Sequence, residues 1–247
     1  MPAVQSVVVG GRSFNVDAGE AYGRFWDKLR RGKWRETDTI DFITRHCRPG
    51  VVLYDIGAWI GPISLLAGNC GAKVYAFEPD PTAFAALARN VAANAFDITI
   101  VNKAVAARTA EPLTLYVKTA LGDSETSALP TGEAETLVVD TIALQDLPAP
   151  GGLTKVVKVD IEGYEYPLRD ALTAFFRDAA ALHMSFHPRQ LQSRRKAWRE
   201  TSRFVRELST LFGVAGPTRW RYQAKAFACC YLQPKIANFH LVFEARA

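Results

Sequence analysis

The segment with the clearest chemical potential is DIGAWIG at residues 55–61, which lies between an apolar run and a helix-like stretch. Gly57 and Gly61 carry no side chain where the backbone must turn sharply and let a ligand approach closely. In a parallel sheet such a turn lies at the carboxyl ends of the strands, where nucleotide-type ligands bind. A dinucleotide would bring a pyrophosphate to this turn, and the carboxylate of Asp55 would repel it.

A second acidic residue, Glu78, follows the next apolar run in the order Phe77-Glu78-Pro79. At a strand end, its carboxylate can accept hydrogen bonds from both hydroxyls of a ribose. S-adenosylmethionine (SAM) has such a ribose and no phosphate, and its ammonium and sulfonium groups favour a carboxylate nearby. The two acidic residues therefore predict a SAM site, in which Asp55 reaches the amino group directly or through water.

Two further carboxylates, Asp160 and Glu162, follow a later apolar run in the sequence DIEG. In a doubly wound sheet this strand end faces the same crevice as Gly57 and Glu78. Beside a cationic sulfonium, one carboxylate can hold the methionine or transfer region of the cofactor. The other can orient or deprotonate a hydroxyl group of a methyl acceptor.

Two histidines, His183 and His187, alternate with Ser185 and so share one face of a predicted strand. A histidine with a near-neutral pKa is a candidate general base, whereas one bonded to backbone carbonyls is structural; the structural interpretation suits His183 better and is balanced for His187. Asp160, Glu162 and His187 also have the chemistry to ligate a metal. Their spacing is not diagnostic, so no metal site is predicted.

Methyl transfer from SAM is a direct displacement in which an acceptor lone pair aligns with the methyl group opposite the sulfur, so positioning dominates catalysis. An alcohol acceptor also needs a base, for which Glu162 and His187 are the first candidates. Asp160 and His183 complete the set of predicted catalytic residues.

Strand-like and helix-like segments alternate in the order typical of a doubly wound α/β sheet. Predicted strands cover residues 51–54, 73–77, 98–101, 156–159 and 181–186, and predicted helices begin at Pro62 and Pro81 and include residues 168–175. Residues 113–117 and 136–139 predict an extra β pair around the turn-rich segment 122–132, which we expect over the active-site edge. Residues 227–232 and 239–243 predict a closing antiparallel strand pair.

The 247 residues suffice for one structural domain with a sizeable core. Residues 20–47 predict helices with a break at Gly32, so residues 1–47 form an N-terminal extension or lid and residues 48–247 the SAM-binding domain. The predicted fold class is α/β: a Rossmann-like, mostly parallel, doubly wound sheet with an antiparallel C-terminal strand pair and an N-terminal helical extension.

Composition narrows the remaining classes of function. No apolar run approaches the length of about 18 to 20 residues that a membrane helix needs, and no secretory signal is evident, so we expect a cytoplasmic protein. The net charge of +5 is concentrated in residues 194–206, either as a solvated helix face or as a patch for an anionic partner. Nucleic acid is the less favoured partner, because no RNA-binding module with interleaved aromatic residues accompanies the charge. The four cysteines form no C-x-x-C pair, which argues against structural zinc and disulfides.

The sequence from about residue 32 to 187 resembles the FkbM-type SAM-dependent methyltransferases. The matching motifs, in the family's order, are DIGAWIG at 55–61, FEPDP at 77–81, NKAVA at 102–106, VDTIAL at 139–144 and KVDIEGYE at 158–165. The resemblance implies a class I methyltransferase fold and SAM as cofactor. It also implies that Glu36 faces the cofactor and that Asn102 and Ala104 flank the adenine, while Ala58 and Pro79 belong to the two cofactor motifs. Trp59 departs from the family's usual Asn, so it either packs as core or reshapes the methionine end of the pocket.

The expected function is O-methylation of a hydroxyl group by SAM, and the resemblance implies a small-molecule or glycan acceptor: a sugar, glycolipid, polysaccharide or secondary metabolite. An N-methyltransferase and a nucleic-acid methyltransferase are the enzymatic alternatives; the latter lacks an N/D-P-P-Y-type motif where this chain has DIEG. A non-catalytic SAM-binding scaffold or partner subunit, with Trp59 marking a decayed pocket, is the alternative from another class, and a dehydrogenase would bind NAD instead. The sequence leaves the oligomeric state open, a homodimer being one candidate.

Overall fold

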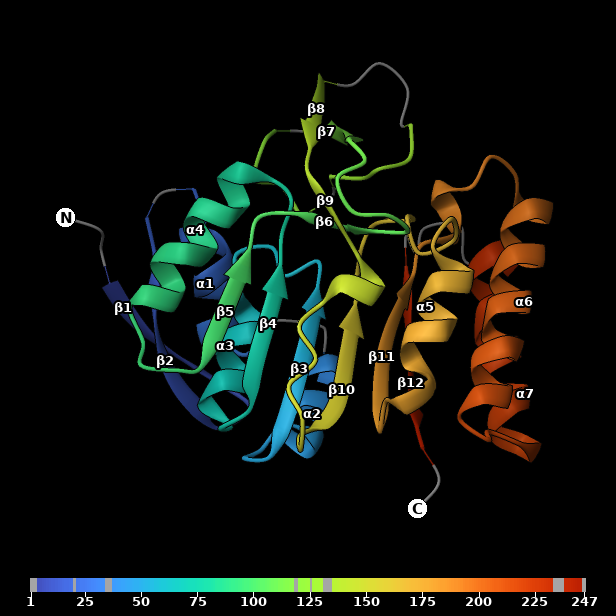
Figure 1. The fold of residues 1–247 in the computed structure, drawn as a ribbon, viewed down its shortest axis with the longest axis horizontal. Coiled ribbons are helices and arrows are strands. Elements are labelled where there is room, and N and C mark those ends of the chain that lie inside the picture. The colour runs from blue at the N-terminus through green and yellow to red at the C-terminus, as the bar shows by residue number, and fades with distance from the viewer. Residues whose placement is uncertain are drawn as a thin grey trace.

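The computed structural model describes residues 4–19, 21–33, 37–117, 120–124, 126–130, 135–232 and 238–245. Its centre is a six-stranded sheet in the order β12-β11-β10-β3-β4-β5 (Figure 1). In that order the strands span Phe239–Glu244, Ala181–Phe186, Thr154–Val159, Val51–Ile56, Lys73–Phe77 and Ile98–Val101. All neighbours are parallel except β11 and β12. The predicted α/β fold class and its antiparallel C-terminal pair are confirmed.

The chain order places a topological switch between β3 and β10. From β3 the chain builds outward to β4 and β5, and it then returns to β10 and builds the other half of the sheet. In open α/β sheets a crevice forms at such a point, outside the carboxyl ends of the strands. The turns after β3, β4 and β10 therefore converge, as the sequence predicts.

Seven helices of the described part of the chain flank the sheet. They are α1 (Gly23–Arg30), α2 (Thr37–His46), α3 (Pro62–Asn69), α4 (Pro81–Ala92), α5 (Arg169–Phe175), α6 (Arg194–Leu211) and α7 (Gly216–Phe227). A proline opens both α3 and α4, where its missing N–H would have no helical partner. The side chain of Asp80 caps α4 by accepting hydrogen bonds from two backbone N–H groups of its first turn.

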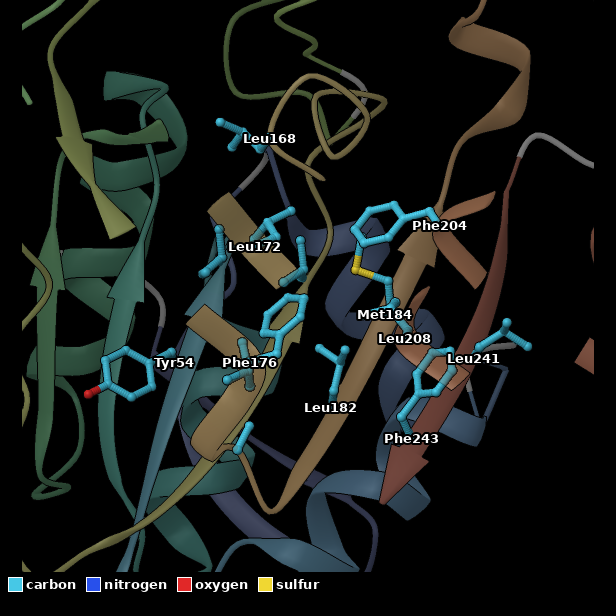
Figure 2. Close-up of a cluster of buried hydrophobic side chains, with 14 of the residues drawn as sticks. Tyr54, Leu168, Leu172, Phe176, Leu182, Met184, Phe204, Leu208, Leu241 and Phe243 are labelled. Atoms are coloured by element: carbon cyan, nitrogen blue, oxygen red, sulfur yellow. The ribbon is translucent and has the colours of Figure 1, made fainter. Parts of the chain in front are cut away.

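Alternate side chains of the strands bury against two different layers. Tyr54, Leu182 and Met184 pack with Phe176 and with Phe204 of α6 on one face (Figure 2). Val51 and Leu53 point to the opposite face, where α2 and α3 cover the sheet and an N-terminal hairpin packs on α3 and α4. Each fully buried Leu or Phe side chain contributes roughly 1.5 to 3 kcal/mol, so both layers hold the strand ends in place.

The N-terminal segment contains more than the predicted helices. Strands β1 (Val4–Val9) and β2 (Arg12–Asp17) form an antiparallel hairpin that the sequence analysis missed. Helices α1 and α2 follow, and Gly32 takes a positive φ of 64° at the expected break between them. Phe25 of α1 reaches the cavity described below.

Small β pairs lie over the carboxyl ends of the parallel strands, as Figure 1 shows above β3, β4 and β5. Strands β7 (Leu113–Val117) and β8 (Glu135–Val139) pair antiparallel, which confirms the predicted extra pair. Strands β6 (Ala104–Ala106) and β9 (Thr141–Ala143) pair parallel beside them. Four residues of the turn-rich segment line the cavity, as expected: Asp123, Ser124, Thr126 and Ala128.

One strand prediction is wrong. Residues 227–232 do not form a strand: helix α7 continues into a π-helical turn at Ala228–Leu232. Ala226, Cys229 and Cys230 are buried at a helical spacing, so the apolar run packs as a helix end. β12 pairs with β11 instead.

Helix α6 is amphipathic. Its inner face buries Phe204, Val205 and Leu208, while its arginines are solvent-exposed. Arg203 lies 2.9 Å from Glu207, and Arg199 lies 3.0 Å from Glu200. The solvated-face interpretation of the basic run thus agrees with the structure. Among the described residues, no helix has both the length and the apolar character needed to cross a membrane.

Candidate active site

A cavity of about 530 Å³ opens at the carboxyl ends of the parallel strands. Gly57 and Ala58 reach it from the turn after β3, Glu78 from the end of β4, and Asp160 and Glu162 from the turn after β10. Pockets of roughly 300 to 1,000 Å³ are typical of small-ligand sites. Four residues predicted from strand-end positions therefore share one ligand-sized cavity with Ala58, which the family resemblance implied.

Gly57 occupies a position that no other residue can fill. Its φ is +83°, and a Cβ built on it would lie 1.9 Å from the carbonyl oxygen of Asp160. The turn after β3 and the turn after β10 thus touch at Gly57. The backbone N–H groups of Gly57 and Ala58 both donate to the carbonyl of Phe77, at 3.1 and 3.0 Å, which fixes the turn to β4 as well.

Glu78 has a buried carboxylate that is already oriented by the backbone. Its Oε2 accepts a hydrogen bond from the N–H of Trp59 and its Oε1 from the N–H of Asp80, both at 2.8 Å. Each oxygen keeps a second lone pair for a further donor. Burial raises the pKa of Glu78 to about 7; the two backbone hydrogen bonds oppose that rise.

Trp59 joins the turn after β3, residues 57–61, which we call the cofactor turn because a cofactor is predicted there, to the turn-rich segment. Its indole Nε1 donates to the carbonyl of Gly122 at 2.8 Å, and its ring packs edge-on against Phe25 and Tyr22. The side chain of Asp80 accepts from the N–H of Gly122 at 2.7 Å. Trp59 lines the cavity wall and leaves a cavity of ligand size, so the indole reshapes the pocket rather than filling it.

Asp160 and Glu162 converge on one buried histidine. Nε2 of His187 lies 3.3 Å from Oδ1 of Asp160 and 3.2 Å from Oε1 of Glu162. On the other side of the ring, Nδ1 lies 3.2 Å from Oε1 of Glu165, which also accepts the backbone N–H of His187 at 2.7 Å. Both His187 and Glu165 are almost fully buried.

The charges around His187 shift two pKa values. Burial alone would lower the pKa of His187, but the charge of Glu165 and the contacts with Asp160 and Glu162 hold it well above its usual range. Burial alone would raise the pKa of Asp160, but His187 and the ammonium of Lys158 hold it below its usual range. His187 without a bound ligand is therefore an imidazolium at neutral pH, which does not fit the prediction that it serves as a general base.

Four predicted residues are not among the described residues that line the cavity: Asp55, Gly61, Asn102 and His183. Asp55 is fully buried, accepts a hydrogen bond from Ser64 of α3 at 2.6 Å and lies 3.2 Å from Nζ of Lys158. The structure therefore gives no support to a direct contact between Asp55 and the cofactor. The reason is strand alternation, since Asp55 follows Val51 and Leu53 onto the α3 face.

Gly61 and Asn102 support the site from outside the cavity. Gly61 begins α3 with a φ of +88°. Asn102 donates to the carbonyls of Glu78 and Pro79 at 2.8 and 3.1 Å, so it braces two predicted contact residues from outside. Glu36 lies outside the described residues.

His183 is buried on the α2 face of β11. Its Nε2 lies 3.1 Å from Oγ1 of Thr39, and its ring packs near Phe42 and His240. Burial lowers the pKa of His183 to about 3. A base with that pKa outside the cavity wall does not serve the reaction, so the structural interpretation of His183 is the better one.

Sequence reasoning missed several charged residues of the site: Lys103, Asp123, Lys158 and Arg189 line the cavity, and Glu165 lies behind His187. Lys158 lines the cavity and donates from Nζ to the carbonyl of Gly57 at 2.7 Å. Glu165 receives the N–H of Gly163 at 2.8 Å and holds the far side of His187. Lys158 and Glu165 both belong to the motif KVDIEGYE, so the motif as a whole was the available signal for these two.

Comparison with known proteins assigns the domain. Residues 54–172 match the family model of the methyltransferase FkbM domain. Residues 54–172 are thus similar to an FkbM methyltransferase domain, which confirms the resemblance found in the sequence. No curated protein matches the sequence.

Several solved structures are similar to this chain at low sequence identity and with TM-scores below 0.5. The geranyl diphosphate methyltransferase complexed with GPP and sinefungin has a TM-score of 0.44 and 11% identity, over 91% of this chain and 82% of that one. TYW2 of P. horikoshii, complexed with MeSAdo, has a TM-score of 0.43 and 13% identity, over 99% and 71%. Trm5b of Pyrococcus abyssi has a TM-score of 0.43 and 16% identity, over 86% of this chain. This chain spans 48% of the Trm5b chain, and 62% of another similar chain, from Pyrococcus horikoshii.

Proposed function

We propose that this chain, through its FkbM methyltransferase domain, carries a methyl group from SAM to a hydroxyl group of a sugar, glycolipid, polysaccharide or secondary metabolite. The observation that carries the proposal is that Glu78 and the pair Asp160 and Glu162 face one cavity from the ends of β4 and β10, the two strands that flank β3. The end with Glu78 suits a ribose. The end with Asp160 and Glu162 suits a positively charged group and can accept a proton from a hydroxyl group. The finer statement, O-methylation, rests on the second end.

The cofactor end of the cavity offers hydrogen-bond acceptors and an apolar wall that suit SAM. At Gly57 the turn after β3 lies directly against the turn after β10, because Gly57 has no side chain to separate them. Glu78 offers both carboxylate oxygens to a ribose diol, and Pro79 and Ala104 supply an apolar wall for a base. SAM supplies an electrophilic methyl group on a positively charged sulfur.

At the acceptor end, Glu162 is the candidate base. Its side chain is 20% exposed and lines the cavity, so its carboxylate reaches solvent-accessible substrate space. The acceptor oxygen forms the new C–O bond with a lone pair as the S–C bond breaks and its electron pair passes to sulfur. The hydroxyl proton passes to the carboxylate of Glu162. Asp160, which His187 positions, holds the positive end of the methionine region.

The N-terminal extension, residues 1–47, acts as a lid in this proposal. Phe25 and Tyr22 pack on Trp59, and Tyr22 donates from its hydroxyl to the carbonyl of Gly122 at 3.3 Å. The segment thus supports both the cofactor turn and the turn-rich segment over the cavity. A cytoplasmic location remains a prediction from the sequence.

Calorimetric titration with SAM, adenosylhomocysteine and NAD tests the cofactor. We expect both adenosyl compounds to bind and NAD not to bind. If neither adenosyl compound binds, the chain is a scaffold or the cavity has another ligand. For the reaction, methyl-labelled SAM is incubated with matched panels of glycosides and aminoglycosides. Label transfer to amines but not to hydroxyls would overturn the O-methylation proposal.

A further inference from the structure

The ring nitrogen Nε2 of His187 faces more acceptors than one proton can satisfy. It lies at nearly equal distances, 3.3 and 3.2 Å, from carboxylate oxygens of Asp160 and Glu162. Nε2 carries one proton at most, so it cannot donate well to both oxygens. Among the described residues, the buried Oδ1 of Asp160 has no hydrogen-bond partner of good geometry. Nε2 of His187, Oδ1 of Asp160 and Oε1 of Glu162 thus lie close enough together to contact one ion between them.

The opposite side of the ring has a separate partner. Nδ1 lies 3.2 Å from the buried carboxylate of Glu165, which is itself fixed by the N–H groups of Gly163 and His187. Glu165 thus favours a proton on Nδ1, so a cation that displaces the Nε2 proton would meet the Nε2 lone pair between the two carboxylates. A carboxylate behind a histidine is the usual support of a histidine that ligates a metal.

The backbone is strained to hold Glu162 in this position. Glu162 has a φ of +49°, a left-handed conformation that costs a residue other than glycine about 1 to 2 kcal/mol. The hydroxyl of Ser127 donates to its carbonyl oxygen at 2.6 Å and stabilises the turn. Such strain is concentrated at sites where a side chain must have one particular direction.

We infer that Asp160, Glu162 and His187 form a binding site for a divalent cation of the Mn²⁺ or Mg²⁺ class. One ligand atom from each residue lies within 4.8 Å of the other two. Ligands about 2.1 Å from an octahedral ion lie roughly 3.0 Å apart, and around a tetrahedral ion about 3.4 Å apart, which brackets the distances from Nε2. Two carboxylates with one imidazole suit Mn²⁺ well.

The charges of the cluster also favour a cation. Three carboxylates, of Asp160, Glu162 and Glu165, surround one imidazole. The nearest ammonium, of Lys158, is directed to the carbonyl of Gly57 and to Asp55. A divalent ion would balance the excess of carboxylates. The carboxamide of Asn238, with Nδ2 3.5 Å from Nε2, lies where its oxygen could complete the site after rotation.

This site deepens the proposed function, on which it rests. A divalent cation lowers the pKa of a hydroxyl group that coordinates it, and it orients the oxygen. Ligation through Oε1 leaves Oε2 of Glu162 to take the hydroxyl proton. The cation would thus hold the acceptor, while Glu78 holds the cofactor.

Electron paramagnetic resonance of Mn²⁺ added to the metal-stripped full chain tests the site. Free Mn²⁺ gives a six-line signal that binding broadens. We expect binding by the wild type, and at least a tenfold loss of affinity in E162Q and in D160N. E165Q should weaken binding by about tenfold through the orientation of His187. E78Q, which removes a cavity carboxylate outside the cluster, should bind Mn²⁺ as the wild type does.

Thermal unfolding of each variant identifies any that fails to fold. If only one of E162Q and D160N folds, the Mn²⁺ affinity of that variant decides the test. Equal Mn²⁺ affinity in the wild type, E162Q and D160N would overturn the assignment, as would the absence of binding by the wild type. Adenosylhomocysteine is titrated into the same metal-free sample. Cofactor binding without Mn²⁺ binding refutes the cation site and leaves the proposed function in place, and the reverse result refutes the proposed function.

Discussion

We predict that Glu78 couples cofactor binding to pH near neutrality. Burial raises its pKa to about 7, so the carboxyl is half protonated at that pH before a cofactor binds. A carboxylate accepts hydrogen bonds from both ribose hydroxyls, whereas a carboxylic acid has lost part of that capacity. If the cofactor binds the ionised form, affinity falls about tenfold for each pH unit below the pKa. We expect adenosylhomocysteine to bind about tenfold more weakly at pH 6 than at pH 8.

The same group affects folding with the opposite sign. The pKa of Glu78 is higher in the folded chain, about 7, than its usual value of 4.5. The folded state therefore binds the proton more tightly, and this contribution to stability is complete below pH 4.5 and lost as the pH rises through 7. At about 1.4 kcal/mol per pKa unit, the loss amounts to about 3 kcal/mol.

The variant E78Q separates this effect from the rest of the molecule. Glutamine cannot ionise, and it has one carbonyl oxygen for the two N–H groups of Trp59 and Asp80. The lost hydrogen bond lowers the stability of E78Q by about 1 to 3 kcal/mol, and this contribution does not itself change with pH. The free energy of unfolding of the wild type relative to E78Q should fall by about 3 kcal/mol between pH 4.5 and 8. Urea denaturation at several pH values measures that difference.

Calorimetry from pH 5.5 to 8.5 measures how the affinity for adenosylhomocysteine depends on pH. In E78Q the affinity should be low and nearly independent of pH. A wild-type affinity that is flat between pH 6 and 8, together with parallel stability curves for the two proteins, would refute the reasoning about Glu78. A pH dependence that persists in E78Q would assign it to another group.

Three further substitutions test the geometry of the site. G57A places a Cβ 1.9 Å from the carbonyl oxygen of Asp160, so it should lower the free energy of unfolding by at least about 3 kcal/mol; unchanged urea denaturation would contradict that contact. W59F keeps a ring beside Phe25 but loses the 2.8 Å bond to Gly122, and the loss of about 1 kcal/mol should accelerate adenosylhomocysteine release roughly fivefold in stopped-flow experiments. E162Q should lower kcat by about 10² or more and leave cofactor affinity within about twofold, and a normal kcat would exclude Glu162 as the base.

Strand ends were predictable because they depend on local sequence. The turn glycine Gly57 and the carboxylates Glu78, Asp160 and Glu162 each follow an apolar run, and parallel strands end at one edge. The N-terminal hairpin also had a local signal: Gly10 and Gly11 separate two alternating apolar segments, which is typical of a two-residue β turn.

The face of the sheet on which a strand side chain lies was not predictable in the same way. Strand β3 is buried on both faces, so apolar residues occupy every position before Asp55 and no alternation marks which face its carboxylate takes. The partner that decides the matter, Ser64, lies on the following helix. The place of Glu165 depends on a left-handed Glu162, and a residue other than glycine gives no local sign of that conformation.

The cofactor turn and the acidic turn form one mechanical unit. The carbonyl of Asp160 fills the space where Gly57 lacks a side chain, and Lys158 donates to the carbonyl of Gly57 from the adjacent strand. A shift of either turn by a few tenths of an ångström must therefore move the other. In a displacement that depends on the alignment of donor, methyl carbon and acceptor, such rigidity matters more than the strength of any single contact. The left-handed Glu162 lies in the same turn, where the hydrogen bond from Ser127 to its carbonyl oxygen offsets part of the backbone strain.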